Sequence, residues 1–176
     1  VGIGAQPVTG LAADAGLAID NGIAVDSLLR ASDEHIYAAG DCCSFPLEIC
    51  GGRRVRLESW RNAQDQGTHA ARNMLGGAEA FGVVPWFWSD QYDLGLQIAG
   101  LADGASQVVR RDVGEGGFIL FHLAEDGRLL AASGIGPGNA VARDIRLAEM
   151  MIAKRIKPDP AELASPDFKL KKLLAG

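Results

Sequence analysis

The sequence predicts an α+β fold in which strands come first and helices come last. Short apolar alternations follow one another after Pro85, and a helical pattern then runs from about Ala140 to Ile156. This order favours an antiparallel sheet that is covered by helices on one face. Because 48% of the 176 residues are hydrophobic and 22% are charged, the chain can bury a core and should fold.

The first 45 residues are expected to form short strands and turns. Residues 11–15 can make one or two helical turns that end at Gly16. An Asn-Gly pair lies between the apolar segments 17–19 and 23–25, which is a strong hairpin signal. Ile36-Tyr37-Ala38-Ala39 is predicted to be a short buried strand that leads into Gly40.

A helix is expected over residues 60–75, with Ser59 as its N-cap and Gly76-Gly77 at its end. The residues at helical spacing predict a closely packed face. They are Trp60, Ala63, Gly67, Ala70, Ala71 and Met74. The stretch from there to Pro85 resembles a linker.

The remaining residues supply the predicted sheet and its helices. After Trp86-Phe87-Trp88, strands are expected at about 94–101 and 107–113, and Asp126-Gly127 favours a hairpin between 118–123 and 128–133. Prolines 158 and 160 end the long helix, and two short helices are expected at the C-terminus. The apolar face of the long helix would hold Val141, Ile145, Ala148, Ile152 and Ile156.

Charge and composition argue against several functions. The net charge is −5, and short basic groups such as Arg53-Arg54-Val55-Arg56 and Lys169–Lys172 are expected to be solvated surface, which disfavours nucleic acid. No apolar run reaches the ~18 residues of a membrane span. The three cysteines, in the absence of a C-x-x-C pair, favour a reducing cytoplasm over disulfides or zinc. The chain begins with Val1 rather than Met, so we expect a piece of a longer protein.

The segment that ends in Gly40-Asp41 carries the strongest chemical signal. A glycine lets the backbone approach a ligand closely, and a carboxylate after a strand can accept a hydrogen bond from a sugar-type hydroxyl. The alternative is an ordinary turn with Asp as the turn former, and the residues alone do not decide between the two.

Four segments of the chain resemble motifs of a known family, in the same order along the sequence. That family comprises the two-dinucleotide-domain flavoprotein reductases, in particular the ferredoxin reductases of the putidaredoxin, rubredoxin and biphenyl-dioxygenase reductase type, which are related to apoptosis-inducing factor. The segments are Val1-Gly2-Ile3-Gly4-Ala5-Gln6-Pro7, Arg30 to Cys42, Arg56-Leu57-Glu58-Ser59-Trp60-Arg61-Asn62-Ala63, and Val84 to Tyr92.

The resemblance implies a C-terminal piece of such a protein, with the end of the FAD domain at 1–82 and a reductase C-terminal domain at 83–176. It implies that Gly40 and Asp41 belong to the FAD site, where Asp41 accepts a hydrogen bond from the ribityl chain, and that the helix that begins at Ser59 and Trp60 points at the flavin pyrimidine ring. Glu58 would lie near the same site, without an assigned role. Trp88 would line the electron exit, and the alternative for Trp88 is core packing between the two domains. NAD(P)H would be the electron donor, and a [2Fe–2S] ferredoxin or a rubredoxin the acceptor.

Two departures limit this interpretation. The redox cysteine pair and the His–Glu pair of the related disulfide reductases are missing, and so are both glycine-rich nucleotide loops, which leaves half a flavin site. The stretch 134–139 does not fit G-x-G-x-x-G and is better explained as a strand-to-helix turn capped by Asn139. The alternatives are therefore a structural or homodimerisation module, with residues 94–101 as an edge strand, and an NADH oxidase like apoptosis-inducing factor.

Overall fold

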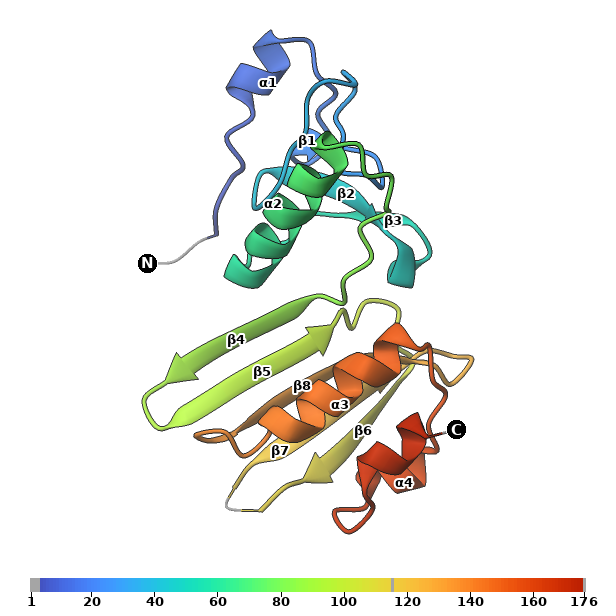
Figure 1. Ribbon diagram of the computed structural model, residues 1–176. Helices are drawn as coiled ribbons and strands as arrows, with labels where there is room; N and C mark the ends of the chain where they lie inside the picture. Colours follow the sequence, from blue (N-terminus) through green and yellow to red (C-terminus); the bar gives the residue numbers. More distant parts are fainter. Residues whose placement is uncertain (1–3, 115, 176) are drawn as a thin grey trace. The chain divides into compact units, whose positions relative to one another are not determined.

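The computed structural model describes residues 4–114 and 116–175, which form two compact units divided between Val83 and Val84 (Figure 1). The first unit contains a three-stranded sheet in the order β1-β2-β3 and the helix α2 (Trp60–Met74). The strands are β1 (Ile23–Ala24), β2 (Cys43–Leu47) and β3 (Arg53–Val55). The short helices α1 (Gly10–Asp14) and η1 (Glu48–Cys50) complete the unit.

The predicted N-terminal hairpin forms, but it is short. One antiparallel bridge joins Ile19 to Ile23 across the Asn-Gly turn, and the amide of Ala24 donates to the carbonyl of Ala18 at 2.9 Å. The partner that was not predicted is β2, which pairs in parallel with β1, and the amide of Ile23 donates to the carbonyl of Cys42 at 2.7 Å. The turn signal was therefore local, whereas the strand partner comes from 20 residues further along the chain.

The predicted linker after α2 packs instead into the first unit. The side chain of Phe81 is 3% exposed and lies edge-on to Phe45, with the ring centroids 5.5 Å apart. Its amide donates to the carbonyl of Ser27 at 2.7 Å. Phe81 is the one aromatic residue in the glycine-rich stretch 76–85, and its burial could have been expected from that.

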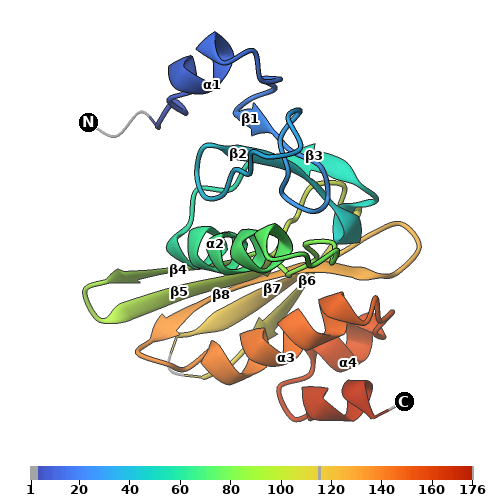
Figure 2. The same ribbon diagram turned by 45° about the horizontal axis from the view of Figure 1, so that its top comes forward.

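The second unit is the predicted antiparallel sheet, with five strands in the order β4-β5-β8-β7-β6. Its strands are β4 (Trp86–Gln91), β5 (Leu94–Gly100), β6 (Gln107–Asp112), β7 (Phe118–Leu123) and β8 (Leu129–Pro137). The helices α3 (Ala142–Ala153) and α4 (Pro160–Ala164) cover one face of this sheet (Figures 1 and 2), and η2 (Leu170–Leu174) follows. The α+β class and the single covered face are confirmed.

Two details of this sheet differ from prediction. The segment Trp86-Phe87-Trp88 is itself part of a strand, so β5 lies between β4 and β8 and is not an edge strand. The edges are β4 and β6. The strand β8 continues through residues 134–137, and α3 has Val141 as its N-cap, without a side-chain cap from Asn139. Glycines 134 and 136 stay in the strand because α3 packs directly on them.

A buried arginine fastens the C-terminal segment to the sheet. Arg111 on β6 is 5% exposed, and its guanidinium donates to the carbonyls of four residues of the segment 163–168. Its Nε lies 3.2 Å from the Asp144 carboxylate of α3. The charge is thus neutralised within the unit, as a buried charge requires.

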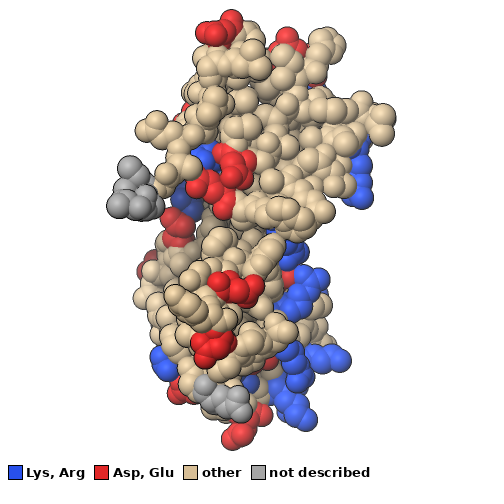
Figure 3. Space-filling view, turned by 90° about the vertical axis from the view of Figure 1, so that its left-hand side faces the viewer, with Lys and Arg blue, Asp and Glu red and all other residues tan. Residues whose placement is uncertain are grey.

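Charge is distributed unevenly along the chain. Residues 140–176 contain eight Lys and Arg and five Asp and Glu, which gives 8 − 5 = +3, while the rest of the chain carries −8. Figure 3 shows basic side chains gathered along one side of the second unit. Of the described residues, no helix is both long and apolar enough to cross a membrane.

Candidate functional site

The Gly40-Asp41 pair forms a tight turn immediately before β2. The amide of Cys43 donates to the carbonyl of Gly40 at 2.9 Å, which closes the turn. Gly40 has φ +82°, a left-handed conformation that glycine adopts without the penalty of a Cβ. The Asp41 carboxylate is exposed, and among the described residues none donates a hydrogen bond to it.

The predicted strand at residues 36–39 is wrong, and so is the placement of Asp41 at the carboxyl end of a strand. Tyr37 makes one isolated bridge to Arg30, and Ile36 is 38% exposed. The strand of this region is β2, which starts two residues after Asp41 and pairs on both sides, with β1 and with β3. Residues Cys43–Leu47 form the strand, rather than residues 36–39, because they are mostly buried and have a strand partner on each side.

Helix α2 holds the Gly40 turn. The side chain of Gln66 is fully buried, and its Oε1 accepts a hydrogen bond from the Gly40 amide at 2.8 Å. A Cβ added to Gly40 would lie 3.4 Å from the Cβ of Ala63. The Gly40 turn therefore packs directly on the first turns of α2. A larger distance between the backbones of the turn and the helix would break the hydrogen bond to Gln66.

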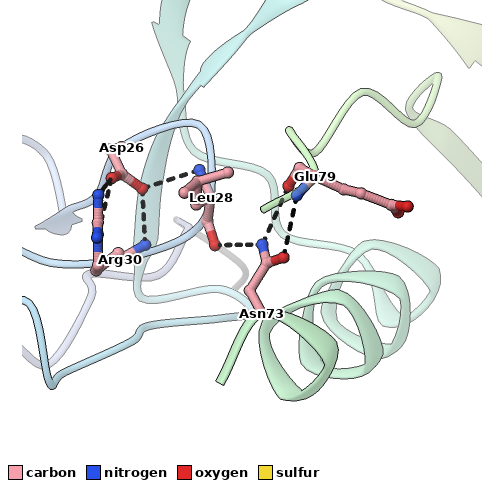
Figure 4. Close-up of polar contacts among 5 residues, drawn as sticks. All are labelled: Asp26, Leu28, Arg30, Asn73 and Glu79. Carbon is pink, nitrogen blue, oxygen red and sulfur yellow. Dashed lines mark hydrogen bonds and ion pairs between the residues drawn. The ribbon is translucent and has the colours of Figure 1, made fainter. Parts of the chain in front are cut away.

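The far end of α2 is fixed in the same manner (Figure 4). The Asn73 amide donates to the carbonyls of Leu28 at 2.9 Å and Glu79 at 3.0 Å, and its Oδ1 accepts from the amide of Glu79. The Leu28 loop is itself closed by Asp26, whose carboxylate accepts from the amide and guanidinium of Arg30. The middle and the C-terminal end of α2 thus bind loop backbone through buried amides.

These amides show that the predicted apolar face of α2 is wrong. The buried residues are Asn62, Gln66, Ala70 and Asn73, whereas Trp60 and Met74 are 66% and 59% exposed. A buried amide is stable only when backbone groups satisfy it, and those partners come from loops that periodicity does not see.

Arg56 joins the turn to the start of α2. Its guanidinium donates to the carbonyl of Asp41 at 3.1 Å and to the carboxylate of Glu58 at 2.7 Å. A weaker bond reaches Asn21 at 3.4 Å. The side chain is 12% exposed, so its predicted place on a solvated surface is wrong. Sequence analysis missed this residue because nothing in Arg53-Arg54-Val55-Arg56 distinguishes the anchored arginine.

The start of α2 has the predicted cap. The Ser59 hydroxyl accepts a hydrogen bond from the amide of Asn62 at 3.3 Å, and Trp60 is the first helical residue. No acidic side chain lies in the first turn. A helix N-terminus without a neighbouring carboxylate in its first turn favours a negative charge placed before it.

Trp88 belongs to the second unit. It lies on the edge strand β4 opposite Gln97, and 41% of its surface is exposed. Phe87, the preceding residue, points to the other face of the same strand and is 42% exposed. The pair therefore presents one aromatic side chain on each face of the edge.

The thiols next to the Asp41 turn do not form a reactive pair. Burial, with a smaller effect of Cys42, raises the pKa of the Cys43 thiol to about 12, so it stays protonated at neutral pH. The Sγ of Cys42 contacts the carbonyl of Ala39 at 3.7 Å. All three cysteines are free, and the described residues contain no cluster of possible metal ligands.

Comparisons with known proteins identify the family of this chain. A family model described as pyridine nucleotide-disulphide oxidoreductase matches residues 1–67, and one described as reductase C-terminal matches residues 86–174. The ferredoxin–NAD(+) reductase component of the anthranilate 1,2-dioxygenase system of Burkholderia cepacia is 45% identical over 175 residues, which cover 99% of this chain and 42% of that protein. Rhodocoxin reductase of Rhodococcus erythropolis is 42% identical over 176 residues, covering 99% and 40%.

Solved structures give the same result. The putidaredoxin reductase in its covalent complex with putidaredoxin superposes with a TM-score of 0.87 at 32% identity, over 98% of this chain and 40% of that one. The ferredoxin reductase for the CYP199A2 system of Rhodopseudomonas palustris superposes with a TM-score of 0.88 at 38% identity, over 97% and 41%. The chain spans about two fifths of the length of these relatives. It belongs to the reductase C-terminal family and corresponds to the C-terminal part of a ferredoxin reductase of the putidaredoxin reductase type.

Proposed function

We propose that this chain is part of an FAD-dependent NAD(P)H:ferredoxin reductase that passes electrons from NAD(P)H through FAD to a [2Fe–2S] ferredoxin of an oxygenase system. The observation that carries the proposal is the Gly40-Asp41 turn fastened to the N-terminal turns of α2. The family supplies the reaction, and the described residues supply one side of a flavin site. Location in the cytoplasm stays a prediction.

The described residues fit such a cofactor on two counts. Gly40 adopts φ +82°, and the space that a Cβ would take faces Ala63 of α2, so the glycine lets the turn before Asp41 lie close to the start of the helix. The exposed Asp41 carboxylate keeps its oxygens available as acceptors. When bound, FAD would accept a hydride and release electrons singly, which is chemistry that no side chain here provides.

In this proposal each residue has a role in binding or orientation. Asp41 accepts a hydrogen bond from a ribityl hydroxyl, and Arg56 holds the Asp41 carbonyl in place. Glu58 orients Arg56 through their 2.7 Å contact. The start of α2, capped by Ser59, offers the backbone N–H of Trp60 and a partial positive charge to the electron-rich end of the flavin.

Trp88 is proposed as the residue at which electrons leave toward the ferredoxin, or toward a rubredoxin. Its support is a large exposed aromatic surface on an edge strand. Replacing Trp88 with Ala should lower the rate of ferredoxin reduction while flavin reduction by NAD(P)H stays unchanged. Phe87→Ala is the matched control, because it removes a comparably exposed ring from the opposite face.

The first test is the visible spectrum of the full-length protein that contains this chain. A flavin spectrum that bleaches with NAD(P)H and returns with a [2Fe–2S] ferredoxin is expected. Asp41→Ala should weaken FAD binding by about 10- to 100-fold, since a hydrogen bond to a charged group contributes roughly 1.5–3 kcal/mol. Asp14→Ala, which changes another exposed carboxylate of the same unit, should leave FAD binding unchanged.

Two results would contradict the proposal. A colourless dimer that takes up no FAD would instead support a structural or dimerisation module. A yellow protein that reduces oxygen rapidly but no iron–sulfur carrier would support the NADH oxidase alternative.

A further inference from the structure

Gln66 makes one hydrogen bond with one end of its amide and none with the other. Its Oε1 accepts from the Gly40 amide at 2.8 Å, while its Nε2 is buried and has no hydrogen-bond partner among the described residues. The orientation of the side chain is fixed by chemistry, because only the oxygen can accept from the Gly40 N–H.

Asn73, which lies two turns further along the same buried face of α2, is paired differently. The Asn73 amide uses both its oxygen and its nitrogen, in three hydrogen bonds to Leu28 and Glu79. A buried donor that lacks an acceptor is unfavourable, whereas a fully paired amide is not. Asn73 therefore contributes to stability, whereas the unpaired Nε2 of Gln66 offsets what its hydrogen bond to Gly40 contributes.

The hydrogen-bond partner of Gln66 indicates the role of this side chain. The bonded group is the amide of Gly40, the residue directly before Asp41, and 26 residues separate Gln66 from it in the sequence. Gly40 also touches Ala63, one turn earlier on α2. The Gly40–Gln66 hydrogen bond therefore fixes the distance and the angle between the Gly40-Asp41 turn and α2, the helix whose N-terminus is proposed to face the flavin.

We infer that Gln66 is a positioning residue for the flavin site, which orients the Asp41 carboxylate by holding the Gly40 amide and contributes little net stability. This inference rests on the proposed function for its ligand, but the hydrogen bond and its unpaired amide nitrogen do not depend on it. Gln66 itself touches no substrate or cofactor.

The test compares Gln66→Met with Asn73→Leu, which each replace a buried amide of α2 with an apolar side chain, two turns apart on one face. Gln66→Met removes the unpaired donor but leaves the Gly40 amide unpaired, so these two effects offset each other. The midpoint of urea unfolding should hardly change. Asn73→Leu leaves the Leu28 carbonyl and the Glu79 amide unpaired, while the Glu79 carbonyl keeps its contact with His69, and its midpoint should fall clearly.

Binding of FAD to the full-length protein should show the opposite order. We expect Gln66→Met to weaken FAD binding about 3- to 10-fold, as loss of one hydrogen bond in the site would. Asn73→Leu should leave FAD binding within about 2-fold of the unsubstituted protein, the scatter that a change of a few tenths of a kcal/mol gives. Gln66→Glu keeps an oxygen for the Gly40 amide and should restore most of the FAD affinity, even if it lowers stability.

Hydrogen exchange of the Gly40 amide in this chain separates the inference from the proposed function. Exchange should accelerate on the order of 10-fold in Gln66→Met and stay unchanged in Asn73→Leu, whether or not FAD binds. If the Gly40 amide is equally protected in Gln66→Met, or if FAD affinity tracks stability across the variants, the inference is wrong. If exchange responds but the unsubstituted full-length protein binds no FAD, the proposed function fails and the structural coupling stands.

Discussion

Gly40 offers the sharpest test of the site, because a second glycine provides a control with the same backbone. Gly40 has φ +82° and Gly51, after η1, has φ +69°. An alanine in this left-handed region is destabilised by roughly 1–2 kcal/mol. A Cβ on Gly51 would meet nothing within 4 Å, and one on Gly40 would meet the Ala63 Cβ at 3.4 Å, an ordinary contact. Both substitutions should therefore cost about the same free energy of unfolding.

Their effects on FAD should differ. An alanine at position 40 strains the Gly40-Asp41 turn itself, because its φ must stay positive there, whereas the strain in Gly51→Ala lies in the turn after η1. We expect FAD affinity of the full-length protein to fall about tenfold or more in Gly40→Ala and to stay unchanged in Gly51→Ala. Urea unfolding, fitted with one transition for each unit, gives the stability and a flavin fluorescence titration gives the affinity. Equal losses of affinity in the two variants would refute the reasoning.

Three further predictions concern single groups. Replacing Arg111 with Met should lower the free energy of unfolding by about 3–5 kcal/mol, because it leaves Asp144 and four carbonyls without their donor. The control Arg110→Met, at an exposed position, should lower it by about 1 kcal/mol or less. Urea unfolding measures both, and a small loss at Arg111 would be contrary to the structure. Cys43, whose pKa burial raises to about 12, should react with a thiol reagent at pH 8 only after unfolding, unlike the other two cysteines; fast reaction of all three would contradict the burial. Burial lowers the pKa of His122 in the folded chain, so as the pH falls below 6.5 the unfolded chain binds a proton before the folded chain does, and stability should decrease. His122→Gln should lose part of this pH dependence. An unchanged profile of stability against pH would show that burial of His122 is not its cause.

The second unit could be predicted almost completely because its elements carry local signals. The Asp126-Gly127 turn and the alternation of β7 and β8 lie next to one another in the sequence, so pairing needs no distant information. The position of each strand in the sheet was less accessible. Residues 94–100 become a central strand only because Trp86–Gln91 pairs with them, and three successive aromatic residues were interpreted as a feature before the strand rather than as its beginning.

The residues of the candidate site were selected from the sequence, and their roles stay predictions, but their contacts could not be predicted. The resemblance selected Gly40, Asp41, Ser59 and Trp60, and the structure brings their segments together through α2 and Arg56. Arg56 and Gln66, which join these segments, were missed, because a largely buried arginine and a buried glutamine have no distinctive local pattern. Their partners are backbone groups 15 and 26 residues away, and such groups are the same in every sequence.

The polar face of α2 explains why a site of this kind is built on loops and yet holds its shape. Apolar contacts are non-directional and tolerate small sliding movements, whereas a hydrogen bond to a backbone amide or carbonyl fixes distance and angle together. Gln66 and Asn73 each fix one loop in this way, two turns apart on one helix. A change at one of the two residues should therefore displace its own loop and leave the other in place. In the proposed flavin site, the turn that carries Asp41 could then be adjusted without altering the loop that Asn73 holds.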